Sequence, residues 1–495
     1  MPISFHFNTI LAQLCSNTSP PCYTPIAMSN ANRSNRAEHL VNHALRYSTP
    51  CCSPEGLPCA LVPLSPFAHD LLPVRSVLFR DWLADTFHRE HDLMPSLLQL
   101  RAALRLFEAK ARRSELSHQS IALRVSHRGE PFDPGAILVD LCNSEGDAIE
   151  ITAAGWQVVS TAGRAFRRSG AQRPLPPPTE PAATLPSALH FPQAALAWLV
   201  SALRPIGPYP ILLLKGPAAS GKTMLARMLR DLIDPSASVF CPRPRTERDV
   251  MRLAWNNYVL ALDDSADLPP AAIAALHRLS TGAPFEFDQS AYSADSLSVR
   301  LQRPIILTTS SECACSGSEA ALANHAITID LPPIAAAQRR TEREILFEFE
   351  CARPALIATL CAAVTLALGN VSSINSEIPS RFADAYQWSL AAAPALGIAA
   401  SQMRMTLCPD ALAREVAAFA HEKHNWEGSP TELLAALQGA HIPDLPNSPE
   451  RLTRRLYQAP LSTLGVTLES FRSGNQRRIR MTLASCSGVT MNQCA

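Results

Sequence analysis

Residues 211–223 read ILLLKGPAASGKT, an apolar segment that runs directly into a glycine-containing loop. The loop satisfies the pattern G-x-x-x-x-G-K-[ST], and the amphipathic segment after it predicts a helix. Glycines let the backbone approach phosphate groups, N–H groups at a helix start donate to phosphate oxygens, and lysine neutralises their charge. We therefore expect a site for ATP. The phosphate-binding residues of this loop are Gly216, Pro217, Ala218, Ala219, Ser220, Gly221, Lys222 and Thr223.

A second apolar segment, VLALDD at 259–264, ends in two carboxylates. This pattern is typical of the strand that holds Mg²⁺ in nucleotide-binding proteins with such a loop. We predict that Thr223 and Asp263 bind the metal ion. Asp264 stands where a carboxylate would polarise the attacking water. Without the preceding loop, an ordinary strand that ends in a polar turn would be the better interpretation.

The whole composition describes a globular chain of several domains. At 495 residues, with 47% apolar and 18% charged residues, the chain is too long for a single core, and about two to four domains are expected. The 14 cysteines are scattered, which favours reduced thiols. The apolar run at 355–368 is too short to cross a bilayer as a helix. We expect a cytoplasmic protein with no membrane partner.

Composition and periodicity together predict the domain organisation. Alternating apolar strands and helices after residue 188 predict an α/β core with a parallel sheet that is covered by helices on both faces. The expected segments are 1–65, poorly ordered; 66–172, an α+β domain; 173–187, a proline-rich linker; 188–345, the nucleotide-binding core; 346–407, helical; 408–484, winged-helix-like; and 485–495, a tail.

Positive charge gathers near the C-terminus of a chain whose net charge is only +1. Ser429 or Thr431 can cap one helix and Ser448 another, and two strands joined at 473–475 would form a wing. Such a patch can hold DNA phosphates, although solubilising surface arginines are the alternative. The predicted DNA-binding residues are Arg451, Arg454, Arg455, Arg477, Arg478 and Arg480, with Arg472 beside them.

Several segments resemble helicase-like ATP-binding proteins of bacterial prophages and mobile elements, which are related to the AAA+ and superfamily-three replication helicases. They are WLVSALRPIGPYPILLLKGPAASGKTMLARMLRDLIDP at 198–235, LDDSADLPPAAIAALHRLSTG at 262–282, RPIILTTS at 303–310 and RRTERE at 339–344. The C-terminal segment looks like the winged-helix module that ends many phage-type primase-helicases. The resemblance implies a P-loop fold of the AAA+ type, DNA as a partner and assembly of copies of the chain into a ring.

Departures from this family concern the catalytic residues. Thr308 stands where relatives carry the asparagine that positions the attacking water, and its hydroxyl can still hold a water molecule. Asn324 and His325 stand where the family places Asp-Arg, and that arginine resembles an arginine finger. Histidine is shorter and only partly charged near neutral pH. A substitute sensor could come from Arg339, Arg340 and Arg343, which equally fit a solvated basic helix face.

Two functions from different classes therefore stay open. The first is an ATPase of the helicase type, with catalytic residues Asp263, Asp264 and Thr308, which remodels DNA of a mobile element. The second is a regulator that binds ATP and DNA without productive hydrolysis. A small-molecule nucleotide kinase is disfavoured, because no segment after the loop resembles a lid over a base.

Overall fold

The computed structural model describes most of the chain as two compact units. The first unit takes in Met1–Ser53, Leu57–Val62 and Leu72–His118, and the second takes in most of the remainder. The described residues are 36–53, 56–63, 69–114, 122–130, 133–160, 166–181, 189, 191–265, 267–288, 296–310, 325–374, 382–398, 411–424, 426–438, 445–458, 461, 466–473 and 476–483.

The first unit packs three helices and a small sheet, in which β1 and β2 are antiparallel, around one apolar core. Its sheet has the order β1-β2-β3. Helix α2 places Leu40, Val41 and Ala44 in the core, at the spacing of one helix face. The prediction that residues 1–65 are poorly ordered is therefore wrong for residues 36–53 and 57–63. The elements are α2 (Arg36–Tyr47), β1 (Thr49–Cys52), β2 (Pro58–Pro63), β3 (His69–Pro73), α3 (Val77–His91) and α4 (Leu97–Arg112).

The second unit begins with a four-stranded antiparallel sheet, which lies within the segment expected to be an α+β domain. Ile149 of this sheet lies in the same apolar cluster as Trp198 and Leu225 of the following core. Leu175 of the proline-rich segment also lies against the sheet, because its N–H donates to the Leu141 carbonyl at 3.0 Å. The chain therefore divides near residue 118, and the predicted boundary at 173–187 is wrong. The strands are β4 (Val125–Glu130), β5 (Asp133–Asp140), β6 (Asp147–Thr152) and β7 (Gly155–Ser160).

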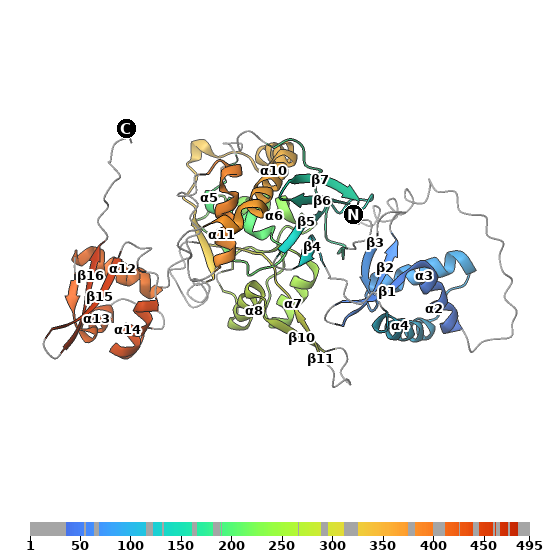
Figure 1. Ribbon diagram of the computed structural model, residues 1–495, viewed down its shortest axis with the longest axis horizontal. Helices are drawn as coiled ribbons and strands as arrows, with labels where there is room; N and C mark the ends of the chain where they lie inside the picture. The colour runs from blue at the N-terminus through green and yellow to red at the C-terminus, as the bar shows by residue number, and fades with distance from the viewer. Residues whose placement is uncertain are drawn as a thin grey trace. The chain divides into compact units, whose positions relative to one another are not determined.

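A parallel sheet of order β13-β8-β12-β9 forms the centre of the second unit. Its residues alternate between two cores. Leu212 and Leu214 pack with α5 and α6, whereas Ile211 and Leu213 pack with α7 and α8, so helices cover both faces as expected. The two helix groups are separated in Figure 1. The elements are α5 (Gln193–Ala202), β8 (Ile211–Lys215), α6 (Lys222–Ile233), α7 (Glu247–Asn256), β9 (Leu260–Leu262), α8 (Pro270–Thr281), β10 (Pro284–Asp288), β11 (Ser296–Arg300), β12 (Ile305–Thr309) and β13 (Ala326–Asp330).

Two helices follow the sheet, as the sequence predicted for this region. They are α10 (Glu342–Asn370) and α11 (Ala383–Ala392). Within the described part of the chain, only α10 with its following turn is long and apolar enough to span a membrane. Half of its most apolar window is buried, and Phe349, Leu356 and Leu360 join the core that holds α5 and α6. This packing is what a core helix requires.

The C-terminal module has three helices and a three-stranded antiparallel sheet of order β14-β16-β15. Ser429 caps α13, because its hydroxyl accepts from the Glu432 N–H and Glu432 accepts from the Ser429 N–H. Ser448 likewise accepts from the Arg451 N–H at 3.3 Å. Strand β14 was not predicted. The elements are α12 (Ala411–Lys423), β14 (Trp426–Gly428), α13 (Pro430–Leu437), α14 (Pro449–Gln458), β15 (Val466–Ser473) and β16 (Gln476–Leu483).

Candidate functional site

The loop between β8 and α6 lies at the carboxyl edge of the parallel sheet. A side chain at Gly216 would place its Cβ 2.5 Å from the Leu331 carbonyl oxygen, so only glycine fits there. Gly221 has φ +81°, and α6 begins at the next residue, Lys222. Ala219 is also left-handed, with φ 62°. Such a turn directs successive backbone N–H groups into one concavity at a helix start, which suits an anion.

Three predicted residues converge beside this loop, although they come from different elements. The Thr223 hydroxyl, in the first turn of α6, donates to Asp263 Oδ1 at 3.2 Å. The Thr308 hydroxyl, on β12, donates to the same oxygen at 2.5 Å. Neighbouring parallel strands bring their carboxyl ends to one edge, which places Asp263 and Thr308 side by side. The structure therefore assembles a cluster of hydroxyl and carboxylate oxygens next to the loop.

Asp264 joins this cluster through its backbone. Its N–H donates to the Thr308 hydroxyl at 3.0 Å, and its φ is 50°. Ser265 follows with its N–H and hydroxyl both directed at the Thr308 carbonyl, at 2.8 and 3.0 Å. The buried Thr308 thus fixes the turn after β9, while the Asp264 side chain is exposed. A left-handed non-glycine residue held in this way is over-determined by its surroundings.

A pocket of about 360 Å³ opens over the loop and the start of α6. It is lined by the loop residues and by Lys222, whose Nζ donates to the Pro217 carbonyl at 3.0 Å. The apolar side chains of Met224, Val239 and Phe240 also line it. A pocket that is lined by a loop with a lysine and by apolar side chains suits a ligand with an anionic end and an apolar end.

Two charged residues of the pocket were missed from the sequence. Arg227 Nη1 lies 3.2 Å from Glu342 Oε1, and both side chains line the pocket. Arg227 follows Thr223 by one helical turn, so helical periodicity could have predicted that it lies on the same helix face as Thr223. Glu342 begins α10 far along the chain, and no local pattern connects it to the loop.

The basic residues proposed as arginine-finger substitutes are dispersed. His325 precedes β13, whose Ala326 pairs with Ile211 at the amino end of β8, so it lies at the sheet edge opposite to the loop. Its ring stacks on that of His277 with centroids 4.5 Å apart. Arg339 donates to the Ile334 carbonyl at 3.1 Å, and Arg340 donates to Glu348 at 2.6 Å. Asn324 lies outside the described residues.

The predicted DNA-binding arginines of the C-terminal module differ in their surroundings. Arg451 and Arg454 are exposed on α14, whereas Arg455 and Arg478 are half-buried. The side chain of Arg477 lies outside the described residues.

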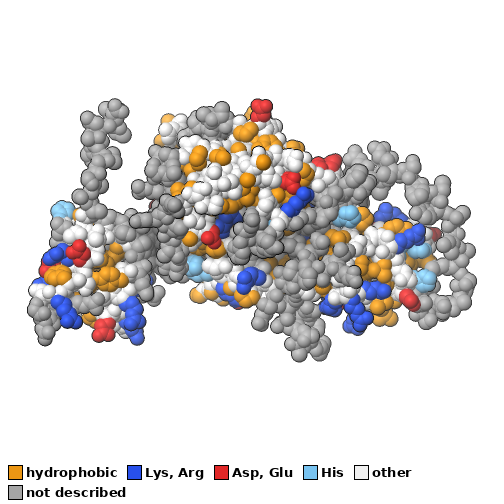
Figure 2. All heavy atoms as spheres, in the orientation of Figure 1, with side chains coloured by type: hydrophobic (Ala, Val, Ile, Leu, Met, Phe, Trp, Pro, Cys, Tyr) orange, Lys and Arg blue, Asp and Glu red, His pale blue; other side chains and the backbone are white. Residues whose placement is uncertain are grey.

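Arg480 is bound by acidic neighbours within the module. Its guanidinium lies 3.2 Å from Glu427 Oε2 and 3.8 Å from Glu469 Oε2. It also lies over the Phe471 ring at 4.7 Å. Figure 2 shows basic, acidic and apolar side chains interspersed on the visible face of this module. The positive charge of the module is therefore less uniform than the sequence indicated, because acidic neighbours offset Arg480.

Comparison with known proteins connects two of these regions to a replication family. Residues 187–407 match the family described as actinomycete integrative conjugative element replication protein, and residues 412–490 match the family's C-terminal domain. The matches cover the parallel-sheet core, which holds the loop of residues 216–223, with its helical region, and the C-terminal module. They support a replication function of a mobile element, which is the broader part of the resemblance noted in the sequence. No curated protein matches the chain.

Solved structures show only a remote likeness. The apo structure of the NrS-1 C terminal region is 9% identical, with a TM-score of 0.36 over 92% of this chain and all of that chain. An inhibitor-bound JCV helicase is 18% identical, with a TM-score of 0.22 over 44% of this chain and 68% of that chain. TM-scores this low do not establish a shared overall fold.

Proposed function

We propose that this chain is a helicase-like replication ATPase of an integrative conjugative element, which binds ATP with Mg²⁺ at the loop of residues 216–223. The observation that carries the proposal is the convergence of Thr223, Asp263 and Thr308 beside that loop. These residues come from the first turn of α6, the turn after β9 and the strand β12, and a chance glycine-rich turn would not gather them.

The residues present fit a magnesium nucleotide. Hydroxyl and carboxylate oxygens are the ligands that Mg²⁺ prefers, and Thr223 and Asp263 offer both at 3.2 Å from each other. The close approach at Gly216 and the left-handed Gly221 shape a cradle for phosphates. Bound ATP with its metal ion would supply the transferable phosphoryl group. Lys222 would neutralise the phosphate charge, while Met224, Val239 and Phe240 would pack against the base.

In this proposal, each residue around the loop has a separate role in ATP hydrolysis. Asp263 would hold the metal ion, and Thr308 would keep the Asp263 carboxylate and the turn at Asp264 in place. The exposed Asp264 carboxylate would orient the attacking water. Because His325 lies at the opposite edge of its own sheet, it could approach a phosphate only in a neighbouring copy of the chain. Assembly into a ring would provide that neighbour.

DNA binding is proposed for the C-terminal module. The family match to a replication protein's C-terminal domain supports it, together with the exposed Arg451 and Arg454 on α14. With three helices and a three-stranded sheet whose last two strands form a hairpin, the module has the elements of a winged helix. Its arginines would contact phosphates, which gives affinity without base specificity.

A second function, a regulator that binds ATP and DNA without productive hydrolysis, is favoured by one observation. Arg339 and Arg340 already bind the Ile334 carbonyl and Glu348 within their own segment. If His325 does not replace an arginine finger, the rate gain of a finger, on the order of 10³ to 10⁵, is lost.

An Asp263→Asn variant tests the ATPase proposal. The amide keeps the shape of the carboxylate but removes the charge for the metal ion, so we expect nucleotide binding to lose its dependence on Mg²⁺ and hydrolysis to cease. Asp267→Asn is the matched control, because Asp267 is 90% exposed and follows in the same segment. Equal Mg²⁺ dependence in both variants and the unaltered chain would contradict the site.

A further inference from the structure

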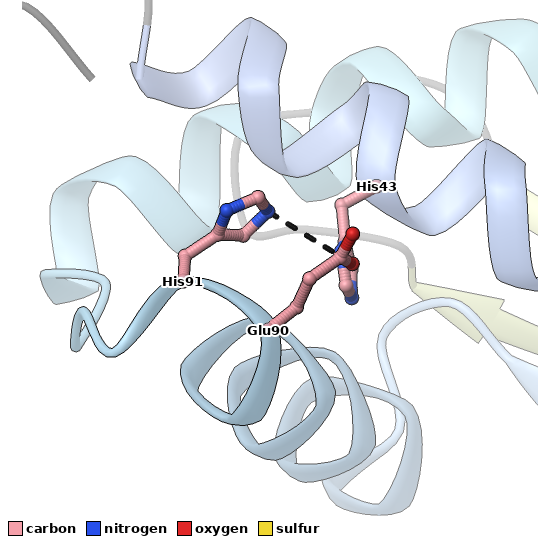
Figure 3. Close-up of side chains that lie close together, drawn as sticks. All are labelled: His43, Glu90 and His91. Carbon is pink, nitrogen blue, oxygen red and sulfur yellow. Dashed lines mark ion pairs between the residues drawn. The ribbon is translucent and has the colours of Figure 1, made fainter. Parts of the chain in front are cut away.

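Two histidines and a glutamate meet in the first compact unit, away from the nucleotide loop. His43 comes from α2, and Glu90 and His91 end α3. One nitrogen or oxygen atom of each side chain lies within 4.8 Å of those of the other two. Figure 3 shows the three side chains directed toward one another across the two helices. Neither the family matches nor the proposed ATPase accounts for this cluster.

His43 is held in a fixed orientation. Its side chain is 3% exposed, and its Nε2 lies 3.2 Å from the Thr86 hydroxyl. That hydroxyl donates its single proton to the Trp82 carbonyl at 2.7 Å, so toward His43 it acts as an acceptor. Nε2 of His43 therefore carries a proton, and Nδ1 is the nitrogen that faces the cluster. The partner of this buried Nδ1 is the Glu90 carboxylate.

The carboxylate of Glu90 is positioned in the same way. Its Oε1 accepts from Arg46 Nη1 at 3.2 Å, which leaves Oε2 for the two imidazoles. Oε2 lies 2.9 Å from His43 Nδ1 and 4.0 Å from His91 Nε2. An Nδ1 this close to a carboxylate oxygen needs a positive charge between the two lone pairs, which either a proton on Nδ1 or a metal ion supplies.

We propose that His43, Glu90 and His91 bind a divalent transition-metal ion of the zinc class. Two imidazole nitrogens and one carboxylate oxygen are a ligand set that Zn²⁺ accepts, with the fourth position left to water. Ligand atoms around tetrahedral zinc lie about 3.3 Å apart, given metal–ligand bonds of about 2.0 Å. Small side-chain rotations of Glu90 and the half-exposed His91 would reach that spacing. The Thr86 and Arg46 contacts are the outer hydrogen bonds that orient ligands at such sites.

The cysteines of the same unit are not alternative ligands. Cys51 of β1 and Cys59 of β2 lie opposite each other in the sheet as free thiols, and both are buried. Burial raises the pKa of the Cys51 thiol to about 12, whereas zinc requires a thiolate. An ion at His43 would instead join α2 to α3. A small core gains most from such a link, because it buries little apolar area.

Metal titration of the full chain tests this site. The protein is stripped with a chelator, dialysed and titrated with Zn²⁺ in excess Mg²⁺, because Mg²⁺ occupies oxygen sites such as that of Asp263 and competes poorly for imidazole. We expect one zinc ion for each chain, and a rise in the melting temperature on binding. Cobalt in place of zinc should give the intense visible bands of a four-coordinate site.

His91→Ala and Glu90→Gln should each weaken zinc binding at least roughly 10-fold and abolish the cobalt bands. His88→Ala is the matched control, since His88 is exposed on α3 one turn earlier, and it should bind zinc normally. Far-UV circular dichroism checks that each variant folds. Absence of stoichiometric zinc, or equal binding by all three variants, would overturn the proposal and leave the His43–Glu90 contact as an ion pair only. ATP binding plays no part in these readouts, so failure here is distinct from failure of the ATPase proposal.

Discussion

The loop of residues 216–223 and the C-terminal module both carry residues that the sequence predicted to bind anions, but their surroundings in the structure differ. Beside the loop, Thr223 and Thr308 both donate to Asp263 and bring the predicted residues together. In the module, Arg480 is bound by Glu427 and Glu469. The first set is made of complementary groups that position one another, whereas the second includes a charge that its own neighbours offset.

This difference shows what each kind of pattern encodes. A glycine-lysine loop specifies backbone conformation and charge within eight residues, so its geometry follows from local sequence. A cluster of arginines specifies charge only. Whether that charge is available to DNA depends on which residues lie opposite across the sheet, and both register partners of Arg480 are glutamates.

The largest effect is expected at Lys222. Lys222→Ala removes the ammonium group nearest to the loop, and charged hydrogen bonds of about 3 kcal/mol correspond to a loss of roughly 100-fold in ATP affinity. Lys110→Ala, at an exposed position of α4, should bind ATP normally. Titration with a fluorescent ATP analogue measures both. Unchanged ATP affinity in a folded Lys222→Ala variant would contradict ATP binding at the loop of residues 216–223.

Substitutions of Thr308 test whether its hydroxyl positions Asp263 and the turn at Asp264 for hydrolysis without contributing to ATP affinity. Thr308→Val keeps the shape of the buried side chain but loses the contacts with Asp263 and the Asp264 N–H, so we expect turnover to fall roughly 10- to 100-fold and stability by about 1–3 kcal/mol. Thr308→Ser retains the hydroxyl and should recover most of the turnover. ATP affinity should change little in either variant. Serine and valine variants of equal activity would show that the hydroxyl has no role.

His325 divides the enzyme from the regulator. If it stands in place of an arginine finger, His325→Arg should raise turnover about 10-fold in the assembled state, because a guanidinium is permanently charged. Dilution below the assembly concentration should remove the gain. No change in a demonstrated oligomer would mean either that another arginine already fills this role or that the site has lost hydrolysis for additional reasons. Single substitutions of Arg339, Arg340 and Arg343 would then identify it, or favour the regulator if none matters.

The smallest effect concerns the two kinds of arginine in the C-terminal module. Arg454→Ala should weaken DNA binding about 5-fold and flatten its salt dependence, because one phosphate contact of about 1 kcal/mol is lost. Arg480→Ala should have less effect, since Glu427 and Glu469 already offset that charge. Glu427→Gln should strengthen binding. Fluorescence anisotropy at several salt concentrations measures the DNA affinity of the three variants. A larger loss of affinity in Arg480→Ala than in Arg454→Ala would show that Arg480, and not Arg454, makes the stronger phosphate contact.

Local patterns predicted the elements of the core well. Alternating apolar strands gave the parallel sheet, and Leu212 and Leu213 do face opposite cores. The sequence also placed the loop, Asp263 and the Ser429 and Ser448 caps. Thr308 was identified only through the family resemblance, because nothing local shows that its hydroxyl would reach Asp263 on a neighbouring strand.

Contacts between distant segments could not be predicted in this way. Glu342 reaches Arg227 at the pocket from a helix that begins far along the chain. The proline-rich composition of residues 173–187 predicted a linker, yet the buried Leu175 packs on the antiparallel sheet and joins it to the core. His43 and Glu90 meet only because α2 packs on the end of α3, and they are 47 positions apart in the chain without a recognisable metal motif.

Single-turnover hydrolysis of ATP by the full chain, with and without single-stranded DNA, tests the central claim most directly. The ATPase account predicts Mg²⁺-dependent release of phosphate that DNA accelerates and that Lys222→Ala and Asp263→Asn abolish. ATP that binds tightly but is not hydrolysed over many hours, with DNA present and an oligomer demonstrated, would contradict enzymatic turnover and leave the regulator. Failure of ATP to bind at all would contradict both.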